Sequence, residues 1–173
     1  AAATIPVAVA GFLLKDTVAE SWRQLEVIAW ATIVFGVLLA VADRARGESE
    51  LISWRHALII GAAQTLALLP GTSRSGITIT AALMLGLCRN SAARFSFLLS
   101  IPTIAGAALL TGFDLTAELG PAHWRDFALG ALLAGVSAYL CIATFIALVE
   151  RTGMLPYVIY RLLLGLALLW IAA

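Results

Sequence analysis

Charge is what this sequence has least of. Only 12% of its 173 residues are Asp, Glu, Lys or Arg, whereas soluble domains carry about 25%. The 11 basic and 10 acidic residues nearly cancel, so the chain has no basic surplus with which to bind nucleic-acid phosphates. The shortage excludes a soluble globular domain and a disordered tail, and it predicts no nucleic-acid partner.

Cysteine is also scarce. Cys88 and Cys141 stand alone in unrelated segments without metal-ligand spacing, which excludes a disulfide framework and a zinc site. An initiator Met and the basic n-region of a signal peptide are missing as well. The first apolar run, residues 5–14, is too short to cross a bilayer. We expect the start to be the remainder of a longer protein, although processing of a precursor would look the same.

Apolar residues, in contrast, make up 62% of the chain, and the mean hydropathy is +1.00. Four runs are long enough to cross a membrane, and they cover residues 25–42, 95–113, 127–149 and 154–173. Charged or polar segments separate the runs, and no soluble insertion or linker interrupts them. The sequence therefore predicts an all-α polytopic membrane protein that forms one integral membrane domain over residues 1–173.

The segment between the first two spans has a different pattern. Residues 57–69 and 77–87 form apolar arms of 13 and 11 residues around the polar sequence PGTSRSG. As helices these arms would be about 20 Å and about 16 Å long, against a hydrocarbon core of about 30 Å. Pro70 breaks the helix, and Gly71 and Gly76 loosen the backbone. The arm lengths favour a re-entrant helix–turn–helix hairpin over two complete crossings.

Arginine is distributed unevenly between the two faces of this topology. Either form of the hairpin puts six arginines on one face, namely Arg44, Arg46, Arg55, Arg89, Arg94 and Arg151. The opposite face has Lys15, Arg23 and Arg125. The positive-inside rule then predicts that the six-arginine face is cytoplasmic.

The turn of the hairpin contains the candidate chemistry. An arginine at membrane depth costs about 2.5–3.5 kcal/mol on insertion scales, and no acid lies in either arm to neutralise Arg74. Hydroxyl groups surround it, and a helix is expected to begin near Ile77. Guanidinium, hydroxyls and a helix N-terminus together suit phosphate oxygens. The alternative is that Ser73 or Ser75 caps the second arm while Arg74 pairs with a distant carboxylate.

Two further polar residues lie in apolar segments. Gln64, taken alone, is expected to form an interhelical hydrogen bond. Arg161 is expected about 10 Å into the last span, where we interpret it as structurally paired with Glu150 or with an acid that is not in this chain. His56 and His123 lie near span ends beside tryptophans, as interfacial residues do, and we do not expect either to be catalytic.

The turn and the segments around it resemble a known family. The sequences QTLALLPGTSRSGIT at residues 64–78 and RFSFLLSIP at residues 94–102 are similar to those of the undecaprenyl-diphosphate phosphatases, the bacitracin-resistance proteins of bacterial inner membranes. The similarity continues to Pro156, Tyr160 and Arg161. It implies a membrane phosphatase that removes the terminal phosphate of a C55 isoprenyl diphosphate and recycles the lipid carrier for peptidoglycan synthesis. The implied fold is two inverted repeats, each with a re-entrant hairpin, and a site that opens toward the periplasm.

The resemblance also assigns roles to residues of the turn. Arg74 and Ser73 are the implied catalytic residues, and Ser73 is a candidate nucleophile although no base is visible nearby. The implied diphosphate-binding residues are Gly71, Thr72, Ser75, Gly76, Thr78 and Gln64. A divalent cation, Mg²⁺ or Ca²⁺, is expected as cofactor, with no ligands in this chain. The implied partners are the isoprenyl diphosphate, membrane lipids, an N-terminal repeat and a second copy in a homodimer.

One family motif is not found in this sequence. Family members have two glutamates four residues apart, followed by a Pro-x-Ser-Ser-x-Gly-His turn. In the hairpin of this sequence the resemblance places Gln64 and Leu68 at the positions of those glutamates. We therefore expect residues 1–42 to be the remainder of a first repeat with a connecting span. The hairpin is expected at residues 51–88 and three transmembrane helices at residues 92–173. On this interpretation the chain holds half of an active site and is inactive alone.

Two other functions fit the same features. Inverted repeats with broken helices also form transporters, so Arg74 could hold the phosphate of a polyprenyl-phosphate lipid in transit. A structural membrane subunit whose hairpin only packs is the third alternative. The specificity of the PGTSRSG motif favours the phosphatase.

Overall fold

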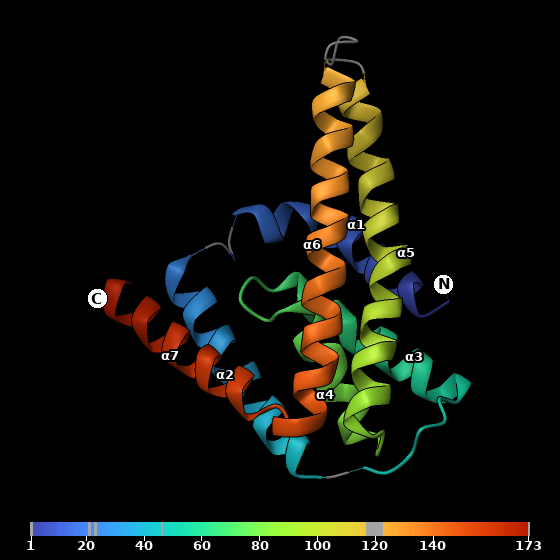
Figure 1. The fold of residues 1–173 in the computed structure, drawn as a ribbon. Coiled ribbons are helices and arrows are strands. Elements are labelled where there is room, and N and C mark those ends of the chain that lie inside the picture. The colour runs from blue at the N-terminus through green and yellow to red at the C-terminus, as the bar shows by residue number, and fades with distance from the viewer. Residues whose placement is uncertain (1, 21, 23, 46, 117–122, 173) are drawn as a thin grey trace.

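The computed structural model describes residues 2–20, 22, 24–45, 47–116 and 123–172. These residues form seven α-helices and two 3-10 helices (Figure 1). In chain order the elements are η1 Ala2–Thr4, α1 Ile5–Glu20, α2 Leu25–Arg44, α3 Trp54–Ala63, η2 Gln64–Leu68, α4 Arg74–Met84, α5 Arg89–Thr116, α6 His123–Thr152 and α7 Leu155–Ala172.

Four of these helices are long and apolar enough to cross a membrane. The spans are Leu25–Arg44, Arg89–Leu109, Arg125–Thr152 and Leu155–Ala172. They coincide with the four predicted runs, although α5 and α6 extend beyond the predicted spans at both ends. Together with the absence of any strand among the described residues, they confirm the all-α polytopic prediction.

The segment between α2 and α5 is a helical hairpin. Its first arm is α3 continued by η2, its second arm is α4, and neither is long enough to be a span. The two ends of the hairpin meet through the backbone, because Ser49 N donates to Gly86 O at 3.1 Å and Cys88 N donates to Ser49 O at 2.9 Å. In Figure 1 the turn of the hairpin, the green loop, ends well short of the far ends of α5 and α6. The helix–turn–helix form of the hairpin is as predicted, and its re-entrant position in a membrane stays a prediction.

The second arm begins earlier than the sequence suggested. A helix start near Ile77 was expected, but α4 starts at Arg74 with Ser73 as its N-cap. The hydroxyl of Ser73 accepts a hydrogen bond from Gly76 N at 3.3 Å, so one of the free amides of the first turn is satisfied. Arg74 and Ser75 therefore belong to the helix rather than to the turn.

The N-terminal helix extends beyond the first apolar run, since α1 continues to Glu20. Its apolar part, Ala2–Leu13, is still shorter than a span. Part of this region packs on the hairpin, since a Cβ added to Gly61 of α3 would lie 2.3 Å from Ala3 O.

Helices α2 and α7 pack closely against each other. A Cβ added to Gly165 of α7 would lie 2.4 Å from a side-chain carbon of Ile33, and one added to Gly36 of α2 would lie 3.3 Å from Cβ of Arg161. Small residues at such points let helix backbones approach. The close packing determines where the middle of α7 meets the hairpin.

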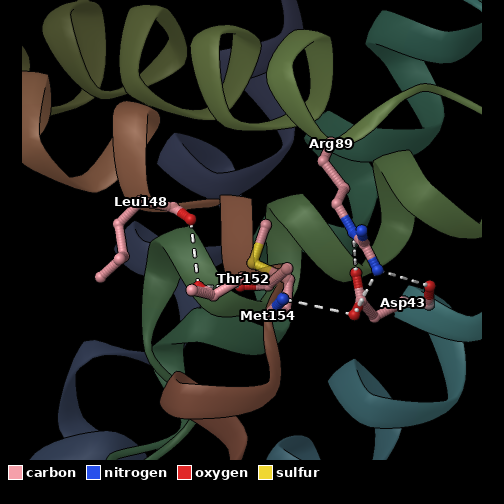
Figure 2. Close-up of polar contacts among 6 residues, drawn as sticks. Asp43, Arg89, Leu148, Thr152 and Met154 are labelled. Atoms are coloured by element: carbon pink, nitrogen blue, oxygen red, sulfur yellow. Dashed lines mark hydrogen bonds and ion pairs between the residues drawn. The ribbon is translucent and has the colours of Figure 1, made fainter. Parts of the chain in front are cut away.

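An ion pair joins α2 and α5 at the end of the bundle where the hairpin enters, and its carboxylate also binds the α6–α7 turn. Arg89 at the start of α5 donates to Asp43 near the end of α2, through Nε at 2.6 Å and Nη2 at 2.8 Å. The same carboxylate accepts a hydrogen bond from Met154 N at 3.2 Å, at the α6–α7 turn (Figure 2).

The same end carries most of the arginine-rich face predicted from the sequence. The ends of α2, α3, α5 and α6 that meet there carry Arg44, Arg55, Arg89, Arg94 and Arg151. Arg46 and Arg23 lie outside the described residues.

Candidate functional site

The turn of the hairpin is seated against α2. Gly71 has φ +91°, and a Cβ at this position would lie 2.3 Å from Ile28 O. Only glycine adopts such a conformation readily and leaves room for so close an approach. Thr32 Oγ1 lies 3.2 Å from Gly71 O, which accepts its hydrogen bond. Gly71 of the motif is thus required by the contact between the turn and α2.

Arg161 of α7 binds the other side of the turn. Its side chain is buried, with 8% of the residue exposed. Nη2 donates to Gly71 O at 2.7 Å, Nη1 to Thr72 O at 2.8 Å and Nε to Thr32 O at 3.3 Å. The predicted pairing with Glu150 is wrong, because α7 carries Arg161 to the hairpin turn and Glu150 instead accepts a hydrogen bond from Asn90.

Ser73 adopts an unusual backbone conformation. Its φ is +64°, and it is the one non-glycine residue with positive φ in the described part of the chain. Such a conformation costs about 1–3 kcal/mol and persists only where the surroundings impose it, most often at functional sites. The side chain of Ser73 is exposed and its hydroxyl caps α4.

Arg74 follows Ser73 and is half-buried. Its Nη1 is buried and has no hydrogen-bond partner, and the same holds for the hydroxyl of Thr72. In the part of the chain that the structure describes, no carboxylate forms an ion pair with Arg74. The alternative interpretation was therefore right that Ser73 caps the helix, but none of the described residues provides the carboxylate that it required for Arg74. Unsatisfied buried N–H groups are rare in proteins, so this one indicates a place for an acceptor.

A cavity of about 480 Å³ opens beside the turn. Polar groups of the turn and of α7 form one part of its wall, namely Gly71, Ser73, Ser75, Gly76 and Arg161. Apolar side chains from α2, α4, α6 and α7, together with two tyrosines, form the rest, among them Ile28, Leu39, Ile79, Phe145, Tyr157, Tyr160 and Leu164. The cavity thus has a small polar part at the helix N-terminus and a larger apolar part, a combination common to small-molecule sites.

The structure gathers some of the predicted site residues and separates others. The cavity wall includes Arg161, which the sequence had suggested only as a structural residue, but it does not include Arg74. A buried arginine in a span is itself a signal of function, so Arg161 could have been found by the reasoning applied to Arg74. Tyr157 was also missed, and Tyr160 was noted only as part of the family similarity, because nothing in their spacing marks them as site residues.

Thr78 and Gln64 hold the hairpin to α5. Thr78 is buried, and its hydroxyl is 2.7 Å from that of Ser96. Gln64 is buried as well, and its Nε2 donates to Thr103 Oγ1 at 3.4 Å. Such bonds are those expected between helices in lipid. The roles of both residues in diphosphate binding stay predictions.

The described residues do not fit a divalent cation. No three His, Cys, Asp or Glu side chains among them lie close enough together to hold a metal ion. His56 is used in the cap of α3, where its Nδ1 accepts a hydrogen bond from Ser53 N. The side chain of His123 lies outside the described residues.

The tip of the hairpin can bind an anion. The first amides of a helix have no intrahelical acceptors and carry partial positive charge, and of these Gly76 N is bound to Ser73. The remaining amides, the hydroxyls of Ser73 and Ser75 and the nearby guanidinium groups are all donors. A set of donors in a poorly solvated site stabilises charge on phosphoryl oxygens.

Comparison with known proteins is consistent with this geometry. A family model described as bacitracin resistance protein BacA matches residues 1–167. The undecaprenyl-diphosphatase of Nitrosococcus oceani is 51% identical over 171 residues, which are 97% of this chain and 64% of that protein. Undecaprenyl-diphosphatase 2 of Stutzerimonas stutzeri is 53% identical over 173 residues, 96% of this chain and 64% of that protein. The chain thus spans about 64% of the length of these relatives.

Proposed function

Because the chain belongs to the bacitracin resistance protein BacA family, we propose that it acts in a membrane phosphatase. The reaction is hydrolysis of undecaprenyl diphosphate to undecaprenyl phosphate and inorganic phosphate, which returns the lipid carrier to peptidoglycan synthesis. Relatives that are 51% and 53% identical are named undecaprenyl-diphosphatase and undecaprenyl-diphosphatase 2. These names favour hydrolysis over transport of the lipid.

The observation that carries the proposal is the unpaired donor at the hairpin tip. Nη1 of Arg74 is buried without an acceptor, next to a helix N-terminus that Ser73 caps. A phosphate supplies acceptor oxygens and negative charge. The described structure offers the Arg74 guanidinium no partner that supplies either at Nη1. The apolar part of the adjacent cavity suits the isoprenyl chain of the same substrate.

The chemistry proposed for these residues is charge stabilisation. As an oxygen nucleophile attacks the terminal phosphorus, the bond to the bridging oxygen breaks and its electron pair stays on undecaprenyl phosphate. Arg74 and the amides of α4 bind the phosphoryl oxygens, on which negative charge is spread in the transition state. The nucleophile is an activated water or the hydroxyl of Ser73, whose proton a base must accept. Attack by Ser73 would form a phosphoserine, which a water molecule must then hydrolyse to release inorganic phosphate and restore the hydroxyl.

The divalent cation remains part of the proposal through the family resemblance. The described residues provide no ligand set for it, and the role of Arg74 does not depend on it. That the 173-residue chain is inactive alone also stays a prediction.

The membrane setting completes the proposal. Four candidate spans support an integral membrane protein. We place it in the bacterial inner membrane with the arginine-rich end in the cytoplasm, following the positive-inside rule. We also propose that the site opens toward the periplasmic face, as the family resemblance implies. A homodimer is the proposed assembly.

A phosphate-release assay tests the function. The intact protein in detergent micelles is expected to release inorganic phosphate from undecaprenyl diphosphate. Micelles have no compartments, so a carrier that only moves the lipid would release none. Absence of release from the folded intact protein would contradict the phosphatase and leave the carrier.

A further inference from the structure

Arg161 binds the backbone of the hairpin turn rather than another side chain. Nη2 donates to Gly71 O and Nη1 to Thr72 O, at 2.7 Å and 2.8 Å. These carbonyls belong to consecutive peptide groups, and the second group also contains the amide nitrogen of Ser73. The planar guanidinium therefore holds the peptide group that leads directly into Ser73.

The orientation of this peptide group determines φ of Ser73. Rotation about the N–Cα bond of Ser73 would swing the Thr72 carbonyl away from Arg161. The observed φ of +64° is uncommon for any residue with a side chain. A conformation of this kind persists only where its surroundings impose it, and the hydrogen bond from Arg161 to Thr72 O is such a constraint.

Arg161 is itself firmly placed. Its Nε donates to Thr32 O at 3.3 Å, and its Cβ faces Gly36 where α2 and α7 approach closely. Its Nη1 lies against the first turn of α4, because a Cβ added to Gly76 would be 2.9 Å from this atom. One side chain thus connects α2, α7, the turn and the N-terminus of α4.

We infer that Arg161 is a positioning residue for the anion site. By holding the Thr72–Ser73 peptide group it keeps Ser73 in its left-handed conformation, and so directs the Ser73 hydroxyl and the first amides of α4 into the cavity. Arg161 acts on the phosphate through Ser73. The kinetic consequence rests on the proposed phosphatase activity, whereas the effect on the turn does not.

Backbone hydrogen exchange of the intact protein in detergent tests the effect on the turn. Arg161→Gln is expected to speed exchange of the amides of Thr72, Gly76 and Ile77 by about tenfold, because these amides donate to Leu69 O, the Ser73 hydroxyl and Ser73 O and the turn opens locally more often. The matched control is Arg151→Gln, which removes an exposed arginine of α6 and should leave these rates unchanged. Unchanged rates in the folded Arg161 variant would overturn the inference.

A second pair of variants separates the conformation of Ser73 from its hydroxyl. Ser73→Gly and Ser73→Ala both remove the hydroxyl, but only glycine adopts positive φ without strain. Adding Arg161→Gln to the glycine variant should therefore speed exchange by less than about threefold, against about tenfold in the alanine variant. An equal effect in the two backgrounds would show that Arg161 does not act through φ of Ser73.

Steady-state kinetics test the consequence for the reaction. Arg161→Gln is expected to lower kcat about 30-fold while KM changes less than about threefold, as for an interaction that matters mainly in the transition state. Arg161→Lys should have a kcat about fivefold higher than Arg161→Gln, since an ammonium can donate to both carbonyls. A raised KM with unchanged kcat would make Arg161 a substrate-binding residue instead. If the parent protein releases no phosphate, the proposed function fails while the exchange results still decide the role of Arg161.

Discussion

Arg89 and Arg161 occupy opposite electrostatic situations in one small bundle. Arg89 is half-buried and has a carboxylate partner, since its Nε lies 2.6 Å from Asp43 Oδ1. Arg161 is more deeply buried, yet it binds only backbone carbonyls. Burial raises the cost of an unneutralised charge, so Arg161 would be expected to need a carboxylate more than Arg89 does.

This difference in pairing indicates that the end of the bundle with Arg89 and the hairpin tip with Arg161 have different roles. The Asp43–Arg89 pair is complete in itself and connects α2, α5 and the α6–α7 turn (Figure 2). At the hairpin tip Arg161 and Arg74 keep their positive charge, and no carboxylate in the described part of the chain pairs with either. Retained charge at membrane depth is expensive and is typical of a site for an anionic ligand. The paired arginine maintains the fold, and the unpaired ones serve the proposed substrate.

The largest effect is expected from the unpaired donor. Arg74→Ala in the intact protein should lower phosphate release by about 10²–10³-fold, the size found when a donor to a developing oxyanion is removed. Thermal unfolding should change little, since Nη1 has no partner to lose. Near-normal turnover of the folded variant would contradict the assignment of Arg74.

The seat of the turn should be the most sensitive structural position. Gly71→Ala would place a Cβ 2.3 Å from Ile28 O at φ +91°, so we expect a loss of about 2–3 kcal/mol in stability. Gly106→Ala is the matched control, because nothing lies within 4 Å of an added Cβ there. Thermal unfolding of the two variants measures the difference, and equal midpoints would show that the turn is not seated on α2 as described.

The complete ion pair should affect stability without affecting chemistry. Asp43→Ala leaves Arg89 and the amide of Met154 without their acceptor, at a cost of about 1.5–3 kcal/mol. The double variant with Arg89→Ala should be less destabilised than the sum of the single variants, because the two groups share one interaction. Phosphate release per folded molecule should stay within about threefold of the parent protein. A larger loss of activity would mean that this end of the bundle also controls the site.

The smallest effect is expected at the hairpin–α5 contact. Ser96→Ala removes a hydroxyl that lies 2.7 Å from the Thr78 hydroxyl and should cost about 1 kcal/mol. Thr78 keeps local acceptors in Arg74 O and Ser75 O, so phosphate release should change little. A strong loss of activity with unchanged thermal stability would instead support the predicted binding role of Thr78.

The large features of the fold could be predicted because the thickness of a bilayer determines how many residues a spanning helix needs. Arms of 13 and 11 residues are too short to cross, and the hairpin followed from that. The predicted start of α4 was three residues too late. Serine and glycine, which the motif contains, are common both in loops and in the capped N-terminus of a helix. Ser73 as N-cap had been considered, but only as an alternative.

The partners of the polar side chains could not be predicted in the same way. Arg161 was expected to bind an acid, but its acceptors are carbonyls of a turn about ninety positions away. The packing of α7 against α2 brings Arg161 to these carbonyls. Thr78 was grouped with the turn hydroxyls by proximity in sequence, whereas the helical rotation of α4 directs it to Ser96. Both outcomes depend on tertiary packing, which a local pattern does not contain.

Binding of a non-hydrolysable methylene-bisphosphonate analogue of the isoprenyl diphosphate tests the central claim most directly. The intact protein, Arg74→Ala and the Asp43→Ala, Arg89→Ala double variant would be titrated in the same detergent. The account predicts that Arg74→Ala weakens the Kd about 100-fold or more and that the double variant stays within about threefold, since a charge-assisted phosphate contact is lost only in the first. Equal affinities for Arg74→Ala and the parent protein would contradict it.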